Sequence, residues 1–212
     1  MQPLPCLKPA VKSLSALALC HLVVASPLHA QIIGDTTLSN HSIVTTNGNL
    51  LTITGGGTAG TNLFHSFEQF SVQTGKTAFF NHAPDIQNII ARVTGGVASS
   101  IDGVIRANAA ANLFLLNPSG IILGPNAVLN IGGSFLASTA SSIKFEDNTE
   151  FSATDPKPLL TVSAPVGLVL GPTPGDIRVQ STSMLSGGVA VTENGDAGQL
   201  LNTAQDLTNT PE

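Results

Sequence analysis

Two arginines in the middle of the chain, Arg92 and Arg106, come nearest to a catalytic arrangement. They are the only bases of this region, and Asp102 lies between them in the sequence. Polysaccharide lyases built on a β-helix use a basic residue beside carboxylates, so this trio could in principle cleave an acidic polysaccharide. An ion pair on an otherwise neutral face is the simpler interpretation, and we prefer it.

Three other patterns resemble ligand sites but lack what those sites require. His65 and His82 have neither an accompanying cysteine nor the spacing of a metal site, so we expect surface or turn residues. Residues 55–60 fit G-x-G-x-x-G, but no helix pattern opens after them, and we expect a flexible turn. The acidic residues 146–150 lack the glycine and the alternation of a calcium loop, which favours a solvated turn. The sequence therefore predicts no metal and no cofactor.

Short strands must position these side chains. Between residues 103 and 139, apolar runs are separated every few residues by Gly, Pro, Asn or Ser, so none reaches helical length. The piece that begins at Asp102 is echoed at Ser119, and Leu115 is echoed by Phe135, at offsets of about 17 and about 20 residues. This period predicts an all-β fold, a single-stranded solenoid of about nine coils with about 20 residues each. We expect the inward-facing side chains to include Leu115, Ile122, Ile131 and Phe135.

The segment before this repeat predicts a cap and an aromatic core. Asn47-Gly48 lies between two apolar runs and is the strongest hairpin signal in the chain, so we expect capping strands at the N-terminal end. Five phenylalanines follow, which we expect to fill the interior: Phe64, Phe67, Phe70, Phe79 and Phe80. Residues 171–212 predict further β coils and then a frayed polar tail.

Residues 1–30 have the pattern of a secretory signal peptide. Lys8 and Lys12 precede an apolar run over residues 14–25, which is about half the length of a membrane span, and Ala30 is a small residue at the expected cut. Removal of this segment takes away both cysteines and leaves 13 acids against six bases, a net charge of −7. We therefore expect no disulfide, no nucleic-acid partner and no membrane-spanning segment in the mature chain.

Three segments of the chain carry recognisable motifs. The first is Arg92, Val93, Thr94, Gly95 and Gly96, and the second, residues 113–126, contains Asn117, Pro118, Ser119, Gly120 and Ile121. The third is IGGSFLAST at residues 131–139. Together they resemble the N-terminal secretion domain of the filamentous haemagglutinin family, the exported partner of two-partner secretion systems, over about residues 31–170. Ser119 stands where the family's N-P-N-G-I box has its second Asn.

The resemblance implies a right-handed parallel β-helix with N-terminal capping strands over residues 31–170. It further implies a secreted, non-enzymatic domain that an outer-membrane partner barrel recognises through periplasmic modules. The domain would nucleate β-helix folding at the cell surface and serve adhesion to a host or cell-surface receptor. Residues 117–121 are then the expected recognition turn. A β-helical polysaccharide lyase and a carbohydrate-binding extracellular solenoid stay open as alternatives.

Overall fold

The computed structural model describes residues 31–180 and 189–191, and every regular element in this part of the chain is a strand. The predicted signal peptide and most of the predicted polar tail lie outside the described residues. The strands are β1 (Ile32–Gly34), β2 (Ser42–Asn47), β3 (Leu50–Gly55), β4 (Gly57–Ala59), β5 (Asn62–Phe70), β6 (Thr77–Phe80), β7 (Asn88–Val93), β8 (Ser99–Ile101), β9 (Val104–Ala107), β10 (Asn112–Leu116), β11 (Ile121–Leu123), β12 (Val128–Asn130), β13 (Phe135–Ser138), β14 (Ser142–Phe145), β15 (Glu150–Ser152), β16 (Pro165–Val169), β17 (Ile177–Val179) and β18 (Val189–Val191).

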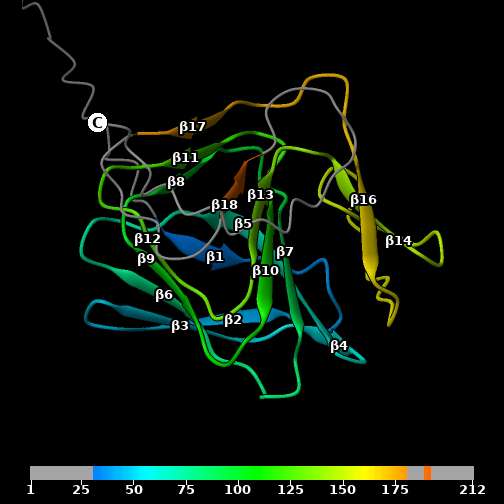
Figure 1. Ribbon diagram of the computed structural model, residues 1–212, viewed down its shortest axis with the longest axis horizontal. Coiled ribbons are helices and arrows are strands. Elements are labelled where there is room, and N and C mark those ends of the chain that lie inside the picture. The colour runs from blue at the N-terminus through cyan, green and yellow to red at the C-terminus, as the bar shows by residue number, and fades with distance from the viewer. Residues whose placement is uncertain (1–30, 181–188, 192–212) are drawn as a thin grey trace, which may run out of the picture.

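The strands stack into a right-handed parallel β-helix of about three turns, which confirms the predicted fold class (Figure 1). The two central turns, β7-β8-β9 and β10-β11-β12, each contribute one strand to each of three sheets. The seven-stranded sheet has the order β1-β5-β7-β10-β13-β18, with β4 paired to β5. The three-stranded sheet of the helix is β17-β11-β8, and we call it the inner sheet only to distinguish it from the outer sheet described below. The five-stranded sheet is β12-β9-β6-β3-β2. No helix in the described ranges is long and apolar enough to cross a membrane.

The coils are longer than the sequence echoes predicted. Leu113 pairs with Ile89 in the preceding coil and with Phe135 in the next, and in the five-stranded sheet Val104 pairs with Thr77. The echo between Asp102 and Ser119 is not a coil repeat, because the strands that follow these two residues lie in different sheets. The expectation of about nine coils is also wrong. These pairings give roughly 22 to 27 residues per coil, within the range of solenoid repeats, and other segments form the cap and an outer sheet.

Antiparallel strands close the N-terminal end, as expected. The hairpin β2–β3 turns at Gly48, whose φ of 59° is a left-handed conformation that glycine adopts without strain. Strand β1 pairs antiparallel with β5. Residues 55–60 are not the expected flexible turn, because they contain β4, which also pairs antiparallel with β5.

Side chains that alternate along each strand fill the helix interior. Leu115 and Phe135 are buried there as predicted, and Ile131 packs against the same cluster. Ile122 faces outward and is only half-buried, because its neighbours Ile121 and Leu123 occupy the inward positions. Three of the five phenylalanines lie in this core, namely Phe67, Phe70 and Phe80.

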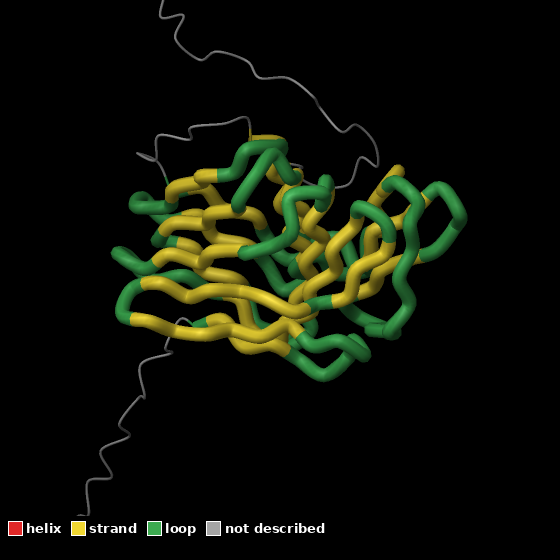
Figure 2. The backbone as a smooth tube through the Cα atoms, turned by 90° about the horizontal axis from the view of Figure 1, so that it is seen from below, coloured by secondary structure: helices red, strands yellow, loops and turns green. Residues whose placement is uncertain are grey.

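The outer face of the seven-stranded sheet is covered by a further antiparallel sheet, β15-β14-β16, here called the outer sheet. Figure 2 shows its strands beside the stacked strands of the helix. A second apolar cluster fills the space between them, in which Phe64 meets Phe151 with ring centroids 5.0 Å apart. Phe64 therefore belongs to this interface and not to the helix interior.

His65 is buried and is not the surface or turn residue that the sequence predicted. It lies in β5 with 1% of its surface exposed, its Nδ1 is 3.0 Å from the Ser42 hydroxyl, and its ring stacks on Phe67. Burial, with a smaller contribution from the nearby His82, lowers the pKa of His65 to about 3. His82 is half-buried in the turn after β6, and that expectation is confirmed.

The buried imidazole predicts a loss of stability on mild acidification. His65 takes up a proton in the unfolded chain below its ordinary pKa of 6.5 but stays neutral in the fold, so protons favour unfolding. We expect the free energy of unfolding to fall by up to about 1.4 kcal/mol per pH unit below pH 6.5. Urea denaturation between pH 7 and 5 measures this slope. His65→Gln should flatten it and His41→Gln, at an exposed position, should not; a flat wild-type profile would contradict the assignment.

Candidate functional site

The structure brings the two family motifs together. Arg92 pairs with Leu116 at the ends of β7 and β10, and Ser99 pairs with Ile121 where the next strands begin. Residues 92–98 and 116–120 therefore turn the same corner, from the seven-stranded sheet into the inner sheet, in successive coils. We call residues 92–96 and 117–121 the motif corner.

Asn117 ties the two coils of the motif corner together. Its side chain is fully buried, and its Nδ2 donates to the carbonyl of Val97 at 3.0 Å and to the hydroxyl of Ser99 at 2.9 Å. Its Oδ1 accepts from the Ser119 amide within its own turn. The amide group is thus satisfied on both sides, and an aliphatic residue here would leave buried polar groups without partners.

The rest of the turn packs against residues 175–176, which precede β17. Gly120 has a φ of 119°, and a Cβ there would lie 3.1 Å from the carbonyl oxygen of Asp176. The amide of Gly175 donates to the carbonyl of Pro118. Ser119 is the exposed residue of the tetrad. The folded domain therefore exposes Ser119 and not Asn117 at this turn.

Arg92 is fully buried and joins the helix to the outer sheet. It points outward from β7, and its Nη1 and Nη2 donate to the carbonyls of Ser152 and Lys157. The guanidinium lies 4.1 Å from the ring centroid of Phe151, within the range of a cation–π contact. No ion pair of Arg92 is present among the described residues, so the expected ion pair on a neutral face is wrong. Burial lowers the pKa of Arg92 to about 10, and nearby Asp35 opposes this shift.

Asp35 reaches Arg92 through hydroxyl groups. Ser66 and Thr94 each donate a hydroxyl to the carboxylate of Asp35 at 2.7 Å, and Thr37 donates both its hydroxyl and its amide. Ser66 and Thr37 in turn accept from Arg92. Burial opposes ionisation of Asp35, but these donors outweigh it and hold its pKa below the ordinary value. The network fixes the N-terminal cap, β5, β7 and the outer sheet relative to one another.

The remaining residues of the first motif shape the corner. Val93 is 2% exposed and packs in the helix core, while Thr94 also donates to the carbonyl of Phe67. Gly95 lies against the carbonyl of Glu68, where a Cβ would not fit, and Gly96 has a φ of 73°. Gly95 and Gly96 are exposed, so the surface of the motif corner is mostly backbone.

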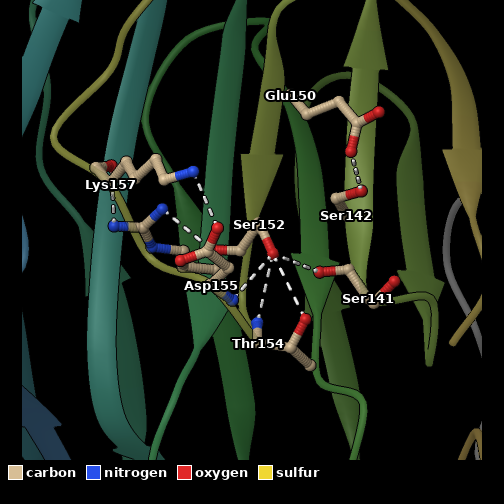
Figure 3. A network of polar contacts seen from close by, with 8 residues as sticks. Ser141, Ser142, Glu150, Ser152, Thr154, Asp155 and Lys157 are labelled. Carbon is tan, nitrogen blue, oxygen red and sulfur yellow. Dashed lines mark hydrogen bonds and ion pairs between the residues drawn. The ribbon is translucent and has the colours of Figure 1, made fainter.

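The loop that holds Arg92 has its own polar contacts (Figure 3). The Ser152 hydroxyl accepts from the amides of Thr154 and Asp155 and donates to the carbonyl of Ser141. These bonds hold the Ser152 carbonyl that Arg92 uses. Lys157 and Asp155 form an exposed ion pair at 2.7 Å, which contributes little by itself.

The residues of the lyase interpretation are not assembled. Asp102 binds Thr74 and Asn126, whereas Arg106 stacks over Phe79 on the outer face of the five-stranded sheet. Phe79 is consequently not the core residue that we expected. Residues 146–149 form the predicted turn between β14 and β15, whereas Glu150 begins β15. The described residues contain no cluster of three side chains able to hold a metal ion.

Sequence reasoning missed an asparagine ladder at the opposite ends of these strands. Asn88 donates to Asn62, Asn112 donates to Asn88, and the Ser134 amide donates to Asn112. Asn62 also donates to the carbonyls of Thr161 and Ser163, beside the outer sheet. The repeat of Asn-Leu-Phe at residues 62–64 and 112–114, two coils apart, was the signal that could have revealed both the ladder and the coil length.

Comparison with known proteins finds one family model that covers most of the chain. The model of the TPS secretion domain matches residues 30–209. A solved structure, the HMW1 secretion domain from Haemophilus influenzae, matches at 24% identity and a TM-score of 0.44 over 52% of this chain and 28% of that chain. The chain thus spans less than a third of the length of that protein. The comparison with curated proteins finds no match.

The buried guanidinium predicts a large cost for its removal. Arg92→Ala leaves the carbonyls of Ser152 and Lys157 without a donor and should lower the free energy of unfolding by about 2–4 kcal/mol. Arg92→Lys should recover only part of this, because an ammonium group lacks the planar fork of donors. Arg106→Ala, at an exposed arginine, should cost less than about 1 kcal/mol. Urea denaturation gives all three values, and equal losses at Arg92 and Arg106 would refute the role of the network.

Proposed function

The chain belongs to the TPS secretion domain family, and from this premise we propose that its motif corner is what the outer-membrane transporter recognises. Membership makes the chain a domain of a two-partner secretion exoprotein, which is exported through an outer-membrane transporter. The proposal adds which residues the transporter reads and in which state of the chain. One observation carries it: the most distinctive side chains of the two motifs, Arg92 and Asn117, are both fully buried in the fold.

Burial of these side chains favours recognition of the unfolded chain. A transporter can contact Asn117 only before the two coils of the motif corner close, and Arg92 only before the outer sheet docks on β7. In an extended chain the segments that flank the motif corner have no strand partner yet, and they can pair with a strand of a periplasmic module. Folding and binding then compete for the same residues, so the domain leaves the transporter as its coils form.

The sequence of residues 31–212 is compatible with export of an unfolded chain that folds afterwards. The cysteines are at positions 6 and 20, so residues 31–212 reach the barrel without disulfides that would block threading. The coils are added in chain order, and each new coil pairs with the preceding one. We propose that this domain nucleates the β-helix outside the cell.

The boundaries and destination are proposals of the same kind. We propose that residues 1–30 are the signal for the inner membrane, that residues 31–170 are the secretion domain, and that residues 171–212 add further coils and a tail. A location outside the cell or at its surface follows from export. Adhesion to a host or cell-surface receptor is supported by the family resemblance alone.

Export should depend on Asn117 beyond its effect on stability. In cells that express the partner transporter, Asn117→Ala should lower the ratio of extracellular to periplasmic protein several-fold, because the transporter loses a side chain that it reads. The matched control is Asn88→Ala, which removes a hydrogen-bonded Asn from the same sheet but outside the motif corner. Urea denaturation of both refolded variants gives their stabilities.

The comparison of the two variants decides between recognition and folding. A loss of export for Asn117→Ala that exceeds the loss for an equally destabilised Asn88→Ala supports the proposal. If export followed stability along one line for both variants, Asn117 would be a structural residue only, and the transporter would read another part of the chain.

A further inference from the structure

Strand β16 is an open edge of the outer sheet. It pairs antiparallel with β14, and among the described residues no strand lies on its other side. Figure 1 shows β16 at the side of the molecule, away from the inner sheet. A Cβ built on Gly167, in the middle of this strand, would meet nothing within 4 Å, so the face of the strand to which it points is uncovered there.

This edge lacks the charges that normally prevent pairing. Exposed edge strands usually carry charges, and Lys above all, that block the approach of another strand. Residues 158–175 contain no charged side chain. The protective features of β16 are Pro165 at its start and the irregularity at Val166, where the register with β14 shifts. Half of the large exposed apolar side chains of the described chain lie within residues 159–170, namely Leu159, Val162, Val166, Val169 and Leu170.

We propose that β16 is an interface at which two copies of this chain pair edge to edge. An antiparallel β16–β16 pair about a twofold axis would join two outer sheets into one continuous sheet, and the same residues would face each other from both copies. Charge favours a second copy at this place. Residues 31–212 carry a net charge of −7, and β16 lies within the uncharged segment 158–175, where two such acidic molecules can approach with the least repulsion.

The proposed pairing uses residues of β16 and none of the motif corner. Within β16, Leu168 packs against the apolar cluster beneath the outer sheet, whereas Val166 is 52% exposed and available to a partner. Recognition by the transporter could therefore fail its test without affecting this inference. The interface predicts that the folded domain dimerises reversibly as its concentration rises.

Sedimentation equilibrium of the processed chain, purified from the periplasm of cells without a transporter, tests the proposal. The wild type should pass from monomer to dimer between micromolar and near-millimolar concentrations. Val166→Lys should raise the dissociation constant at least about tenfold, since it places a charge on the uncharged edge strand of each copy. Val128→Lys is the matched control, because Val128 is 41% exposed and lies on the edge strand β12.

A second measurement does not depend on the folding of any variant. Amide hydrogen exchange of the wild type should slow at residues 166–169 as concentration rises, while β12 should not change. A wild type that is monomeric throughout would overturn the proposal. A dimer that Val128→Lys weakens as much as Val166→Lys, or one without protection of β16, would also overturn it, because another face would then form the contact.

Discussion

The buried amide of Asn117 is the interaction on which the corner of this β-helix depends. A parallel β-helix gains stability only when one coil lies on the next, and turns are where neighbouring coils most easily lose register. Asn117 bonds to the coil below through Val97 and Ser99 and to its own turn through Ser119. Since these bonds exist only after two coils have closed, the residue that marks the family's motif is accessible before folding and inaccessible afterwards.

Arg92 links the outer sheet to the helix in the way that Asn117 links two coils. Its guanidinium bonds to carbonyls that lie about 60 residues further along the chain, so its charge is compensated only when the outer sheet has docked. Asp35 supplies a nearby negative charge through the hydroxyls of Ser66 and Thr37. The cap, the helix and the outer sheet are therefore joined at the buried guanidinium of Arg92. The outer sheet, which comes later in the chain, completes the surroundings of this residue of β7.

The strands and the turns between them could be predicted from the sequence, but their register could not. Gly, Pro and Asn between short apolar runs identify the strands because turn chemistry is local, and Asn47-Gly48 located the capping hairpin for the same reason. The echo from Leu115 to Phe135 missed the true register by two residues, since Phe135 pairs with Leu113. The outward position of Phe64 and the burial of His65 and Arg92 depend on how the outer sheet and the cap pack on the helix. No local sequence pattern predicts this packing. Residues 92–96 and 117–121 could be singled out from the sequence, but their meeting at one corner could not be predicted without the coil length.

Capture of the chain by the purified periplasmic modules of its transporter tests most directly whether recognition precedes folding. The chain should be offered to the modules in two forms, freshly diluted from urea and fully refolded, with the extent of folding followed by circular dichroism. If recognition requires an unfolded motif corner, the modules will retain the freshly diluted chain, and retention will decay as the coils form. Equal retention of the refolded chain would contradict the account, because Arg92 and Asn117 are then out of reach.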